Sequence, residues 1–382
     1  MTTNVPHNVI RSARPSHSLQ VNRLSLHGWK SIHSLDDLVF LDVNVLIGQN
    51  GAGKSNLISL FRMLGWIADE RLQEYTITSG GASSLLYCGA SSTPQMSLLL
   101  EIDSKAGRSE YFAALYHAAP DILFFGEEAY RFTPIDSPSG DLQSLGSAHR
   151  ESLLTTQAQP GNTAGFLLES LKKLSVFQFH NTSQTARMRQ RWNINDSYRL
   201  KEDAANIAPF LKDLSENYNR HYRLIVETIR QIMPFFLDFV LDPVGDAVML
   251  LWRERNSDLV YSAFQASDGM LRIIALVALL LQPEERLPAL LILDEPELGL
   301  HPFAIGIIAG LIRSVSMHCQ ILVATQSTTF VDEFDPHEII VVDRDSSGRS
   351  QFRRLDTDSL REWLNEYSIS ELWEKNVIGG RP

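Results

Sequence analysis

The stretch that decides the fold is VNVLIGQNGAGKSNLISL, which runs from Val43 to Leu60. Its central part, Gly48–Ser55, fits the pattern G-x-x-x-x-G-K-[ST] of a P-loop. The run before the loop, Phe40–Ile47, is apolar and β-branched, which predicts a buried strand. Apolar residues at helical spacing follow in Asn56–Leu64 and predict a helix. The chain is therefore expected to place a glycine-rich loop between a strand and a helix, the arrangement that binds phosphate.

This loop predicts ATP and Mg²⁺ as cofactors. The backbone N–H groups of such a loop, with the N-terminus of the following helix, bind phosphate oxygens. Lys54 is expected to reach the β- and γ-phosphates, and the Ser55 hydroxyl to bind Mg²⁺. A chance match in a tight turn is the alternative, which the flanking strand and helix disfavour. The residues predicted to bind the nucleotide here are Asn50, Gly51, Ala52, Gly53, Lys54, Ser55 and Asn56.

A second motif, PALLILDEP, occupies Pro288–Pro296 and contains two adjacent carboxylates. Its apolar run predicts a buried strand, and ligands of a parallel sheet bind at the carboxyl ends of the strands. Asp294 is suited to hold Mg²⁺, and Glu295 is suited to polarise an attacking water during catalysis. The alternative is a strand followed by an acidic turn, which the presence of a P-loop disfavours.

Composition and charge limit the class of protein. The 382 residues are 44% hydrophobic and 21% charged, which is typical of a soluble globular protein with a large core. The net charge of −11 excludes a globally basic surface for nucleic acid. Any DNA or RNA contact is expected at the densest basic cluster, Arg187, Arg189 and Arg191. A solvated face or salt bridges within the chain are the alternatives for this cluster.

The sequence predicts a cytoplasmic protein without membrane contact. The most apolar run, Ile273–Leu281, is far shorter than the roughly 20 residues that cross a bilayer. The two cysteines, Cys88 and Cys319, form neither a disulfide framework nor a metal-binding spacing, which fits a reducing cytosol. Met1–Ser18 lacks a secretory apolar core and is expected to be a flexible tail.

The remaining pattern predicts a single α/β domain over residues 19–382, with its core in 19–75 and 260–382 and an inserted region in 76–259. Within the insert, three short strands between residues 97 and 125 predict an antiparallel meander. Residues 134–165, rich in Ser, Gly, Pro and Gln, predict a mobile excursion. Ser267 or Asp268 can cap a buried helix, and Leu360–Trp373 predicts one terminal helix.

Four motifs together resemble one family. The form G-x-N-G-x-G-K-S-N at Gly48–Asn56 resembles the P-loop of SMC- and RecF-like ATPases of the ABC class. SDGMLR at Ser267–Arg272 resembles their signature motif, and LLILDEPELGLHP at Leu290–Pro302 resembles their Walker B motif and D-loop. ATQS places Gln326 at the switch position, where His is commoner. From Leu19 onward, the chain looks like stand-alone bacterial ATPases related to the overcoming-lysogenization-defect and RecF groups.

The resemblance implies an ABC/SMC-head-type P-loop NTPase fold, with a mixed central sheet, an antiparallel β subdomain and a helical lobe. It also implies a head-to-tail dimer in which Ser267 and Gly269 of one subunit contact the γ-phosphate held by the other. Arg272 would add charge there, or form a salt bridge within the helical lobe. His301 would contact the second subunit, or only cap a turn. Lys30, in the turn Trp29-Lys30-Ser31, would approach the phosphates or lie on the surface.

Gln326 is expected to take part in catalysis, with Glu295 and Lys54. Gln178, His180 and Asn181 are alternative candidates for the Q-loop residue. The signature SDGMLR, in place of LSGGQ, argues against a transporter motor. Too few residues follow Ser327 for the nuclease domain of the overcoming-lysogenization-defect relatives, and Asp343 with Asp345 makes a weak nuclease candidate.

The expected function is therefore ATP hydrolysis to ADP and phosphate by a nucleotide-sandwich dimer in DNA repair or anti-phage defence. The alternative is a slow nucleotide-dependent switch or scaffold that gates a separate nuclease or toxin.

Overall fold

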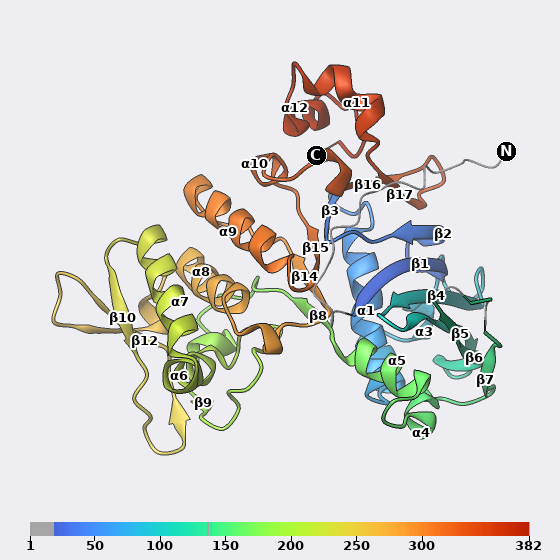
Figure 1. Ribbon diagram of the computed structural model, residues 1–382, viewed down its shortest axis with the longest axis horizontal. Helices are drawn as coiled ribbons and strands as arrows, with labels where there is room; N and C mark the ends of the chain where they lie inside the picture. The colour runs from blue at the N-terminus through green and yellow to red at the C-terminus, as the bar shows by residue number, and fades with distance from the viewer. Residues whose placement is uncertain (1–18, 136, 139, 382) are drawn as a thin grey trace.

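The computed structural model describes residues 19–135, 137–138 and 140–381. A mixed six-stranded sheet lies at its centre, in the order β17-β16-β3-β15-β14-β8 (Figure 1). All neighbours in this sheet are parallel except β17, which pairs antiparallel with β16. The strands are β3 (Val43–Ile47), β8 (Leu174–Phe177), β14 (Leu290–Asp294), β15 (Gln320–Ala324), β16 (Ile339–Arg344) and β17 (Ser350–Arg354). The expected mixed central sheet is confirmed.

The second large sheet is antiparallel, in the order β2-β1-β4-β5-β6-β7. The expected meander, β4 to β6, is confirmed, but it is not separate from the first strands of the chain. Instead β4 pairs with β1, with Leu24 opposite Leu100. The strands are β1 (Gln20–Trp29), β2 (Ile32–Val39), β4 (Gln95–Asp103), β5 (Gly107–Ala118), β6 (Ile122–Pro134) and β7 (Gln143–Gly146).

Helix α1 (Lys54–Ala68) packs between the two sheets (Figure 1). Its apolar residues, such as Phe61, belong to the same buried cluster as Leu24 of β1 and Leu46 of β3. Val45 of β3 belongs instead to the core on the other side of the central sheet. Because successive strand residues point to opposite faces, a strand covered on both sides must be apolar throughout. This is why the strand before the P-loop reads as a continuous apolar run.

A helical lobe covers the other face of the central sheet, on the left in Figure 1. Its central helix is α8 (Asp268–Leu280), which packs against its neighbours α7 and α9. Because α8 is surrounded, its apolar residues extend around nearly the whole helix. The lobe includes α6 (Ile207–Asn217), α7 (Asn219–Ile232), α9 (Pro302–Val315), a small sheet of β10 (Phe236–Val240), β12 (Leu251–Glu254) and β13 (Val260–Ser262), and the pair β9 (Trp192–Asn193) and β11 (Ala247–Val248).

Two expectations about local structure are wrong. The predicted terminal helix is divided into α11 (Thr357–Leu364) and α12 (Ile369–Glu374), because Ser368 begins a new helix with a capping box. The excursion at 134–165 contains β7 and α4 (Leu154–Gln157), and the buried carboxylate of Glu128 holds it through Ser152 and His149. The other helices are α2 (Leu72–Thr78), α3 (Ala82–Leu85), α5 (Thr163–Lys172) and α10 (Thr328–Val331).

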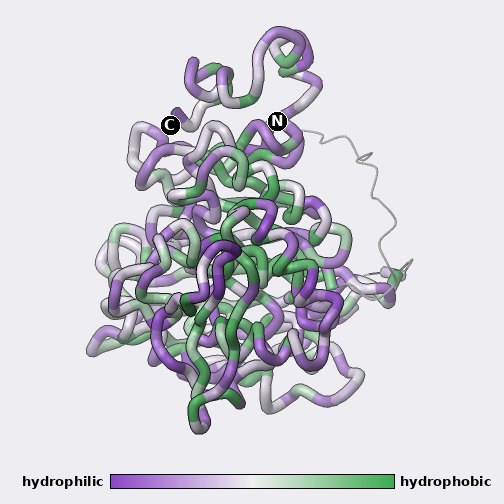
Figure 2. The backbone as a smooth tube through the Cα atoms, turned by 90° about the vertical axis from the view of Figure 1, so that its left-hand side faces the viewer, coloured by the Kyte–Doolittle hydropathy of each residue, from purple (hydrophilic) through white to green (hydrophobic). Residues whose placement is uncertain are grey.

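Figure 2 shows hydrophobic segments gathered within the molecule and hydrophilic ones toward its outside. In the part of the chain that the structure describes, no helix combines the length and apolarity needed to cross a bilayer. The tail expected at Met1–Ser18 lies outside the described residues.

Candidate nucleotide-binding and catalytic site

Three neighbouring parallel strands of the central sheet end at the same edge. The P-loop follows β3, Asp294 ends β14, and Thr325 follows β15. The strands are in register, since Leu293 lies opposite Val323 and Val323 lies opposite Val45. The tertiary structure therefore brings the two sequence motifs and the switch segment together, although about 240 residues separate the P-loop from Asp294.

The P-loop needs glycine at specific positions. Gly51 has a φ of 76° and Gly53 a φ of 123°, values that side-chain-bearing residues rarely adopt. A Cβ atom on Gly53 would also collide with the hydroxyl of Ser350. No side chain caps α1, whose first residue is Lys54. Its first N–H groups are therefore available to phosphate oxygens, as a helix N-terminus in a P-loop requires.

Lys54 lies folded against the loop. Its side-chain ammonium donates hydrogen bonds to the carbonyls of Gly48, at 2.5 Å, and Gln49, at 3.3 Å. Burial lowers the pKa of Lys54, whereas the nearby carboxylates of Glu295 and Asp294 raise it. The cation is therefore held beside the acidic residues of the Walker B motif.

Residues from distant parts of the chain form hydrogen bonds with the P-loop. The Ser350 hydroxyl donates to the Ala52 carbonyl, and it lies 2.6 Å from the Ser31 hydroxyl. The Asn56 side-chain amide donates to that same Ser31 hydroxyl at 2.6 Å. Arg344 donates to the carbonyl of Gly51 at 2.7 Å. Ala52 and Asn56 are thus engaged within the protein, while Asn50, Gly51 and Ser55 are exposed at the loop and helix start.

The three Q-loop candidates differ in their contacts. Gln178 donates from its side-chain amide to Asp294 Oδ2 at 3.2 Å and to His180 Nδ1 at 3.0 Å. The same side chain accepts from Arg62 at 3.3 Å. Asn181 instead bonds to Ser183 within its own turn. Gln178, with His180 behind it, is therefore the residue of this segment that contacts the Asp294 carboxylate.

The two Walker B carboxylates differ in their surroundings. Asp294 is 9% exposed, and burial is the main cause that raises its pKa. Glu295 has left-handed backbone geometry, with φ at 46°, and its N–H donates to the Ala324 carbonyl at 2.8 Å. The side-chain amide of Gln326 donates to Glu295 Oε1. His180 Nε2 lies 3.9 Å from the other Glu295 oxygen.

Sequence reasoning assigned no role to Glu297, the third carboxylate in the site. It is 7% exposed, and Thr325 donates to its Oε1. Its Oε2 is buried and has no hydrogen-bond partner among the described residues. Burial raises the pKa of Glu297. The signal was present in the sequence, since a third acid so close to the Asp-Glu pair is unusual for a buried turn.

The signature and D-loop residues contact each other. Ser267 is exposed, and its hydroxyl caps α8 by accepting from the Met270 N–H at 3.2 Å. A Cβ atom on Gly269 would lie 3.1 Å from the carbonyl of Gly299 in the D-loop. Of the two expected caps, Ser267 is therefore the one used. Within the described residues, no hydrogen bond joins Ser267 to the P-loop of the same chain.

Arg272 and His301 are engaged inside the chain. Arg272 donates to the carbonyls of Phe179, His180 and Leu298, which ties the Q-loop to the D-loop. Among the described residues Arg272 forms no salt bridge, and its expected role at the phosphate stays a prediction. His301 caps α9 by accepting from the Phe303 N–H at 3.3 Å, which agrees with the capping alternative.

Lys30 is half-buried beside α1, so it is not a surface residue, and its expected approach to the phosphates stays a prediction. Its ammonium donates to the Ser59 hydroxyl at 2.9 Å, one helical turn beyond Ser55, and it lies 5.2 Å from the Trp29 ring centroid. Burial lowers the pKa of Lys30, and Arg62 adds to this effect.

The expected nucleic-acid contact is wrong for Arg189, because this residue is 2% exposed. Its guanidinium donates to the carbonyls of Thr182, Ala263 and Ala266 and to Asp268. A buried arginine in this environment holds the lobe together and cannot bind a nucleic acid. Arg187 is exposed but pairs with Asp203 at 3.2 Å, and Arg191 is exposed.

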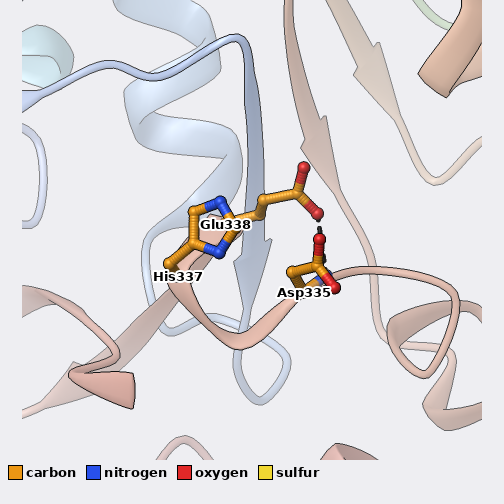
Figure 3. Close-up of side chains that lie close together, drawn as sticks. All are labelled: Asp335, His337 and Glu338. Atoms are coloured by element: carbon orange, nitrogen blue, oxygen red, sulfur yellow. Dashed lines mark hydrogen bonds between the residues drawn. The ribbon is translucent and has the colours of Figure 1, made fainter. Parts of the chain in front are cut away.

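Two other features lie at the opposite edge of the central sheet. Asp335, His337 and Glu338 form a group with metal-ligand geometry, shown in Figure 3. However, Glu338 accepts from the Asp335 N–H in a capping box, and Arg313 lies 3.5 Å from Glu338. The group therefore acts as a helix cap. A cavity of about 520 Å³, lined by Ser175, Arg286 and others, opens at the starts of β8 and β14.

Comparison with known proteins gives a family match. Residues 43–332 match the family described as "AAA domain, putative AbiEii toxin, Type IV TA system". None of the curated proteins compared with the chain matches it in sequence.

Among solved structures, the chain is similar to an SMC head bound to the C-terminal winged-helix domain of ScpA. The TM-score is 0.54 at 16% identity, over 89% of this chain and 99% of that one. It is similar, with a TM-score of 0.54 and 15% identity, to the SMC head with an extended coiled coil bound to the C-terminal domain of ScpA derived from Pyrococcus furiosus. That match covers 91% of this chain and 99% of the other.

These structural matches show the fold, and the expected resemblance to AAA/ABC-type ATPases of the SMC-like group is confirmed. Since the family match spans most of the chain, the protein belongs to the family of AAA domains described as a putative AbiEii toxin of a type IV toxin–antitoxin system.

Proposed function

We propose that this protein is a Mg²⁺-dependent ATPase whose nucleotide site is the carboxyl edge of β3, β14 and β15. The observation that carries the proposal is the pairing of Gln326 with Glu295, beside Asp294 and the uncapped start of α1. These groups supply the anion-binding loop, the cation-binding carboxylate and the base that a P-loop hydrolase needs.

The residues of the chain fit a Mg²⁺ ion. Asp294 and the exposed Ser55 hydroxyl are hard oxygen donors of the kind that Mg²⁺ prefers. When bound, the ion would neutralise charge on the phosphate oxygens. Its positive charge would also relieve the unfavourable burial of the Asp294 carboxylate, which raises the pKa of that group. Gln178 orients this carboxylate from the other side.

Each catalytic residue then has a distinct task. Lys54 leaves the carbonyls of Gly48 and Gln49 to contact the phosphates. Glu295 accepts a proton from the attacking water, and Gln326 fixes the direction in which the Glu295 carboxylate points. Because the backbone of Glu295 turns away from the strand direction, its side chain and that of Asp294 can serve one site.

We also propose that a second copy of the chain completes the site. Ser267, at the exposed start of α8, would contact the nucleotide on the P-loop of the partner, with Gly269 behind it. The exposed apolar side chains of Phe264, Leu298 and Phe303 lie next to these motifs in the chain and support a contact surface there. Arg272 would act indirectly, by holding the D-loop against the Q-loop.

For the biological role, we propose DNA repair or anti-phage defence in the cytoplasm, with a separately encoded nuclease or toxin as partner. The toxin–antitoxin wording of the family description supports this class of role. A contact with DNA or RNA would involve Arg187 and Arg191, without Arg189. The division into a core at 19–75 and 260–382 and an insert at 76–259 also remains a proposal. One strand of the central sheet, β8, lies within the insert.

A slow nucleotide-dependent switch is the second candidate function. The Gln326 amide engages a Glu295 oxygen that an attacking water would otherwise approach, and this supports slow turnover. Near-zero turnover with tightly retained nucleotide would favour the switch, whereas stimulation of hydrolysis by DNA would favour the repair or defence ATPase.

The experiment that tests the ATPase proposal is phosphate release with and without Mg²⁺, on the parent and on Glu295→Gln. Glu285→Gln is a matched control, since Glu285 is exposed at the opposite edge of the sheet. Parent and control should hydrolyse ATP equally, and Glu295→Gln should be far slower. Equal rates in parent and Glu295→Gln would remove Glu295 from catalysis.

A further inference from the structure

We propose that Glu297 and Thr325 form a positioning pair that holds Gln326 against Glu295, so that ATP hydrolysis, but not ATP binding, depends on it. This inference rests on the proposed ATPase function. Both residues lie within motifs described above, Glu297 in Leu290–Pro302 and Thr325 in Ala324–Ser327, but neither was itself expected to act in the chemistry.

The hydroxyl of Thr325 uses both of its hydrogen-bonding functions. It donates to Glu297 Oε1, and it accepts from the Ser327 N–H at 3.0 Å. The Thr325 N–H also donates to the carbonyl of Leu46 in β3, at 3.0 Å. Gln326 therefore lies between Thr325 and Ser327, which the Thr325 hydroxyl links by a hydrogen bond. This restricts the backbone from which the Gln326 amide reaches Glu295.

Glu297 holds the other side of this contact. It belongs to a turn in which the Leu298 N–H donates to the Glu295 carbonyl at 3.2 Å, and the Leu300 N–H donates to the Glu297 carbonyl at 3.0 Å. Three hydrogen bonds therefore join the turn after β14 to the end of β15 and the residues that follow it. They are the Glu295 N–H to the Ala324 carbonyl, Thr325 to Glu297, and Gln326 to Glu295. The Thr325–Glu297 link is buried, whereas the Gln326–Glu295 link is partly exposed.

Burial of the Glu297 carboxylate destabilises the fold, which is unexpected for a residue without a function. Its carboxylate is buried, and its second oxygen has no partner among the described residues. A buried, incompletely bonded carboxylate destabilises the fold relative to an amide or an apolar side chain of similar size. Burial is the main cause that raises the pKa of Glu297, while hydrogen bonds from Thr325 and from the backbone at Glu297 and Gln326 act in the opposite direction. Costly polar groups of this kind occur at functional sites, where geometry matters more than stability.

The test measures kcat and KM of steady-state ATP hydrolysis, and the affinity for ATP, in the parent and in six variants. Thr325→Val and Glu297→Ala remove the link, whereas Thr325→Ser and Glu297→Gln keep a hydroxyl and an acceptor in place. Thr329→Val is the matched control, because Thr329 is exposed on α10. The sixth is the double variant Thr325→Val, Glu297→Ala. The two disrupting variants should lower kcat by roughly tenfold or more, with KM within about twofold, as expected when an interaction matters only for chemistry.

The conservative variants should retain most of the parent kcat. The double variant should be no worse than either single disrupting variant, because the two residues act through one contact. Parent-like kcat in Glu297→Ala, or a double variant with the product of the single losses, would overturn the positioning pair. A Glu297→Gln variant as inactive as Glu295→Gln would also overturn it, since Glu297 would then act by its charge.

Amide hydrogen exchange on the nucleotide-free proteins separates this inference from the ATPase proposal. Thr325→Val and Glu297→Ala should speed exchange at Gln326 and Ser327, while Thr329→Val should not. Unchanged exchange in both disrupting variants would overturn the pair whether or not the protein hydrolyses ATP. Faster exchange in the two disrupting variants, together with no ATP turnover by the parent protein, would refute the ATPase proposal alone.

Discussion

The side-chain amide of Gln326 donates a hydrogen bond to the carboxylate of Glu295, although the two residues belong to different strand ends. Glu295 is the first residue beyond β14, and Gln326 is the second beyond β15. These strands are parallel neighbours in register, with Asp294 opposite Ala324, so the turns that follow them lie side by side. The contact fixes the orientation of the proposed catalytic carboxylate, and the predictions below depend on it and on its surroundings.

Lys54→Ala should weaken ATP binding. The ammonium of Lys54 lies at the P-loop carbonyls, from which it can reach phosphates, and one charge-assisted hydrogen bond contributes about 1.5–3 kcal/mol. The expected loss is roughly ten- to hundredfold in affinity by calorimetry. Lys105→Ala, at an exposed turn, is the control and should bind like the parent. Equal affinities for the two variants would remove the P-loop assignment.

Glu295→Gln should bind ATP and retain it in a dimer. The substitution keeps the shape of the side chain but removes the proton acceptor, so bound ATP persists and favours the state that binds it best. Light scattering should show a doubled mass only with ATP. Adding Ser267→Arg, which places bulk and positive charge at the exposed start of α8, should abolish this dimer. A mass that never depends on ATP would reject nucleotide-driven closure while leaving the catalytic role of Glu295 in place.

Arg189→Ala should destabilise the helical lobe. The substitution leaves the carbonyls of Thr182 and Ala266 without the Arg189 donor, and each unpaired buried group costs about 1–3 kcal/mol. Urea unfolding should show this loss, whereas the exposed Arg187→Ala should change stability by less than about 1 kcal/mol. A parent-like midpoint for Arg189→Ala would contradict the structural role.

Arg187→Ala with Arg191→Ala should reduce the salt dependence of any DNA or RNA binding. Both side chains are exposed in a chain of net charge −11, and each lost phosphate contact lowers the slope of log affinity against log salt by about one. Fluorescence anisotropy at several salt concentrations measures this slope. An unaltered slope would leave the two arginines as ordinary surface residues.

Glu297→Gln should stabilise the nucleotide-free protein at neutral pH. Burial raises the pKa of Glu297 above its unfolded value, so the ionised group destabilises the folded state. Stability associated with this group is complete below the unfolded pKa and is lost as the pH rises through the folded pKa. The gain of Glu297→Gln over the parent in thermal unfolding should therefore be largest above the raised pKa and shrink toward pH 4.5. A gain that does not change with pH would show that charge is not its cause.

The sequence alone determined the strand–loop–helix of the P-loop, the buried strand ending in Asp294, and the capped apolar helix at Ser267. Each of these elements is decided by residues that are close to one another in the sequence. The pattern of apolar residues records burial directly, and glycines record backbone geometry that side chains rarely adopt.

Only the tertiary structure decided the rest, because those features depend on which distant segments meet. Arg189 reads as surface charge in the sequence, yet it is buried by carbonyls more than seventy residues away. Gln178 and Asn181 follow the same strand, and only the position of Asp294 distinguishes them. Glu297 became part of the site because parallel pairing of β14 with β15 placed Thr325 beside it. Local patterns carry no information on such contacts, since the hydrogen-bonding capacity of a side chain does not specify its partner.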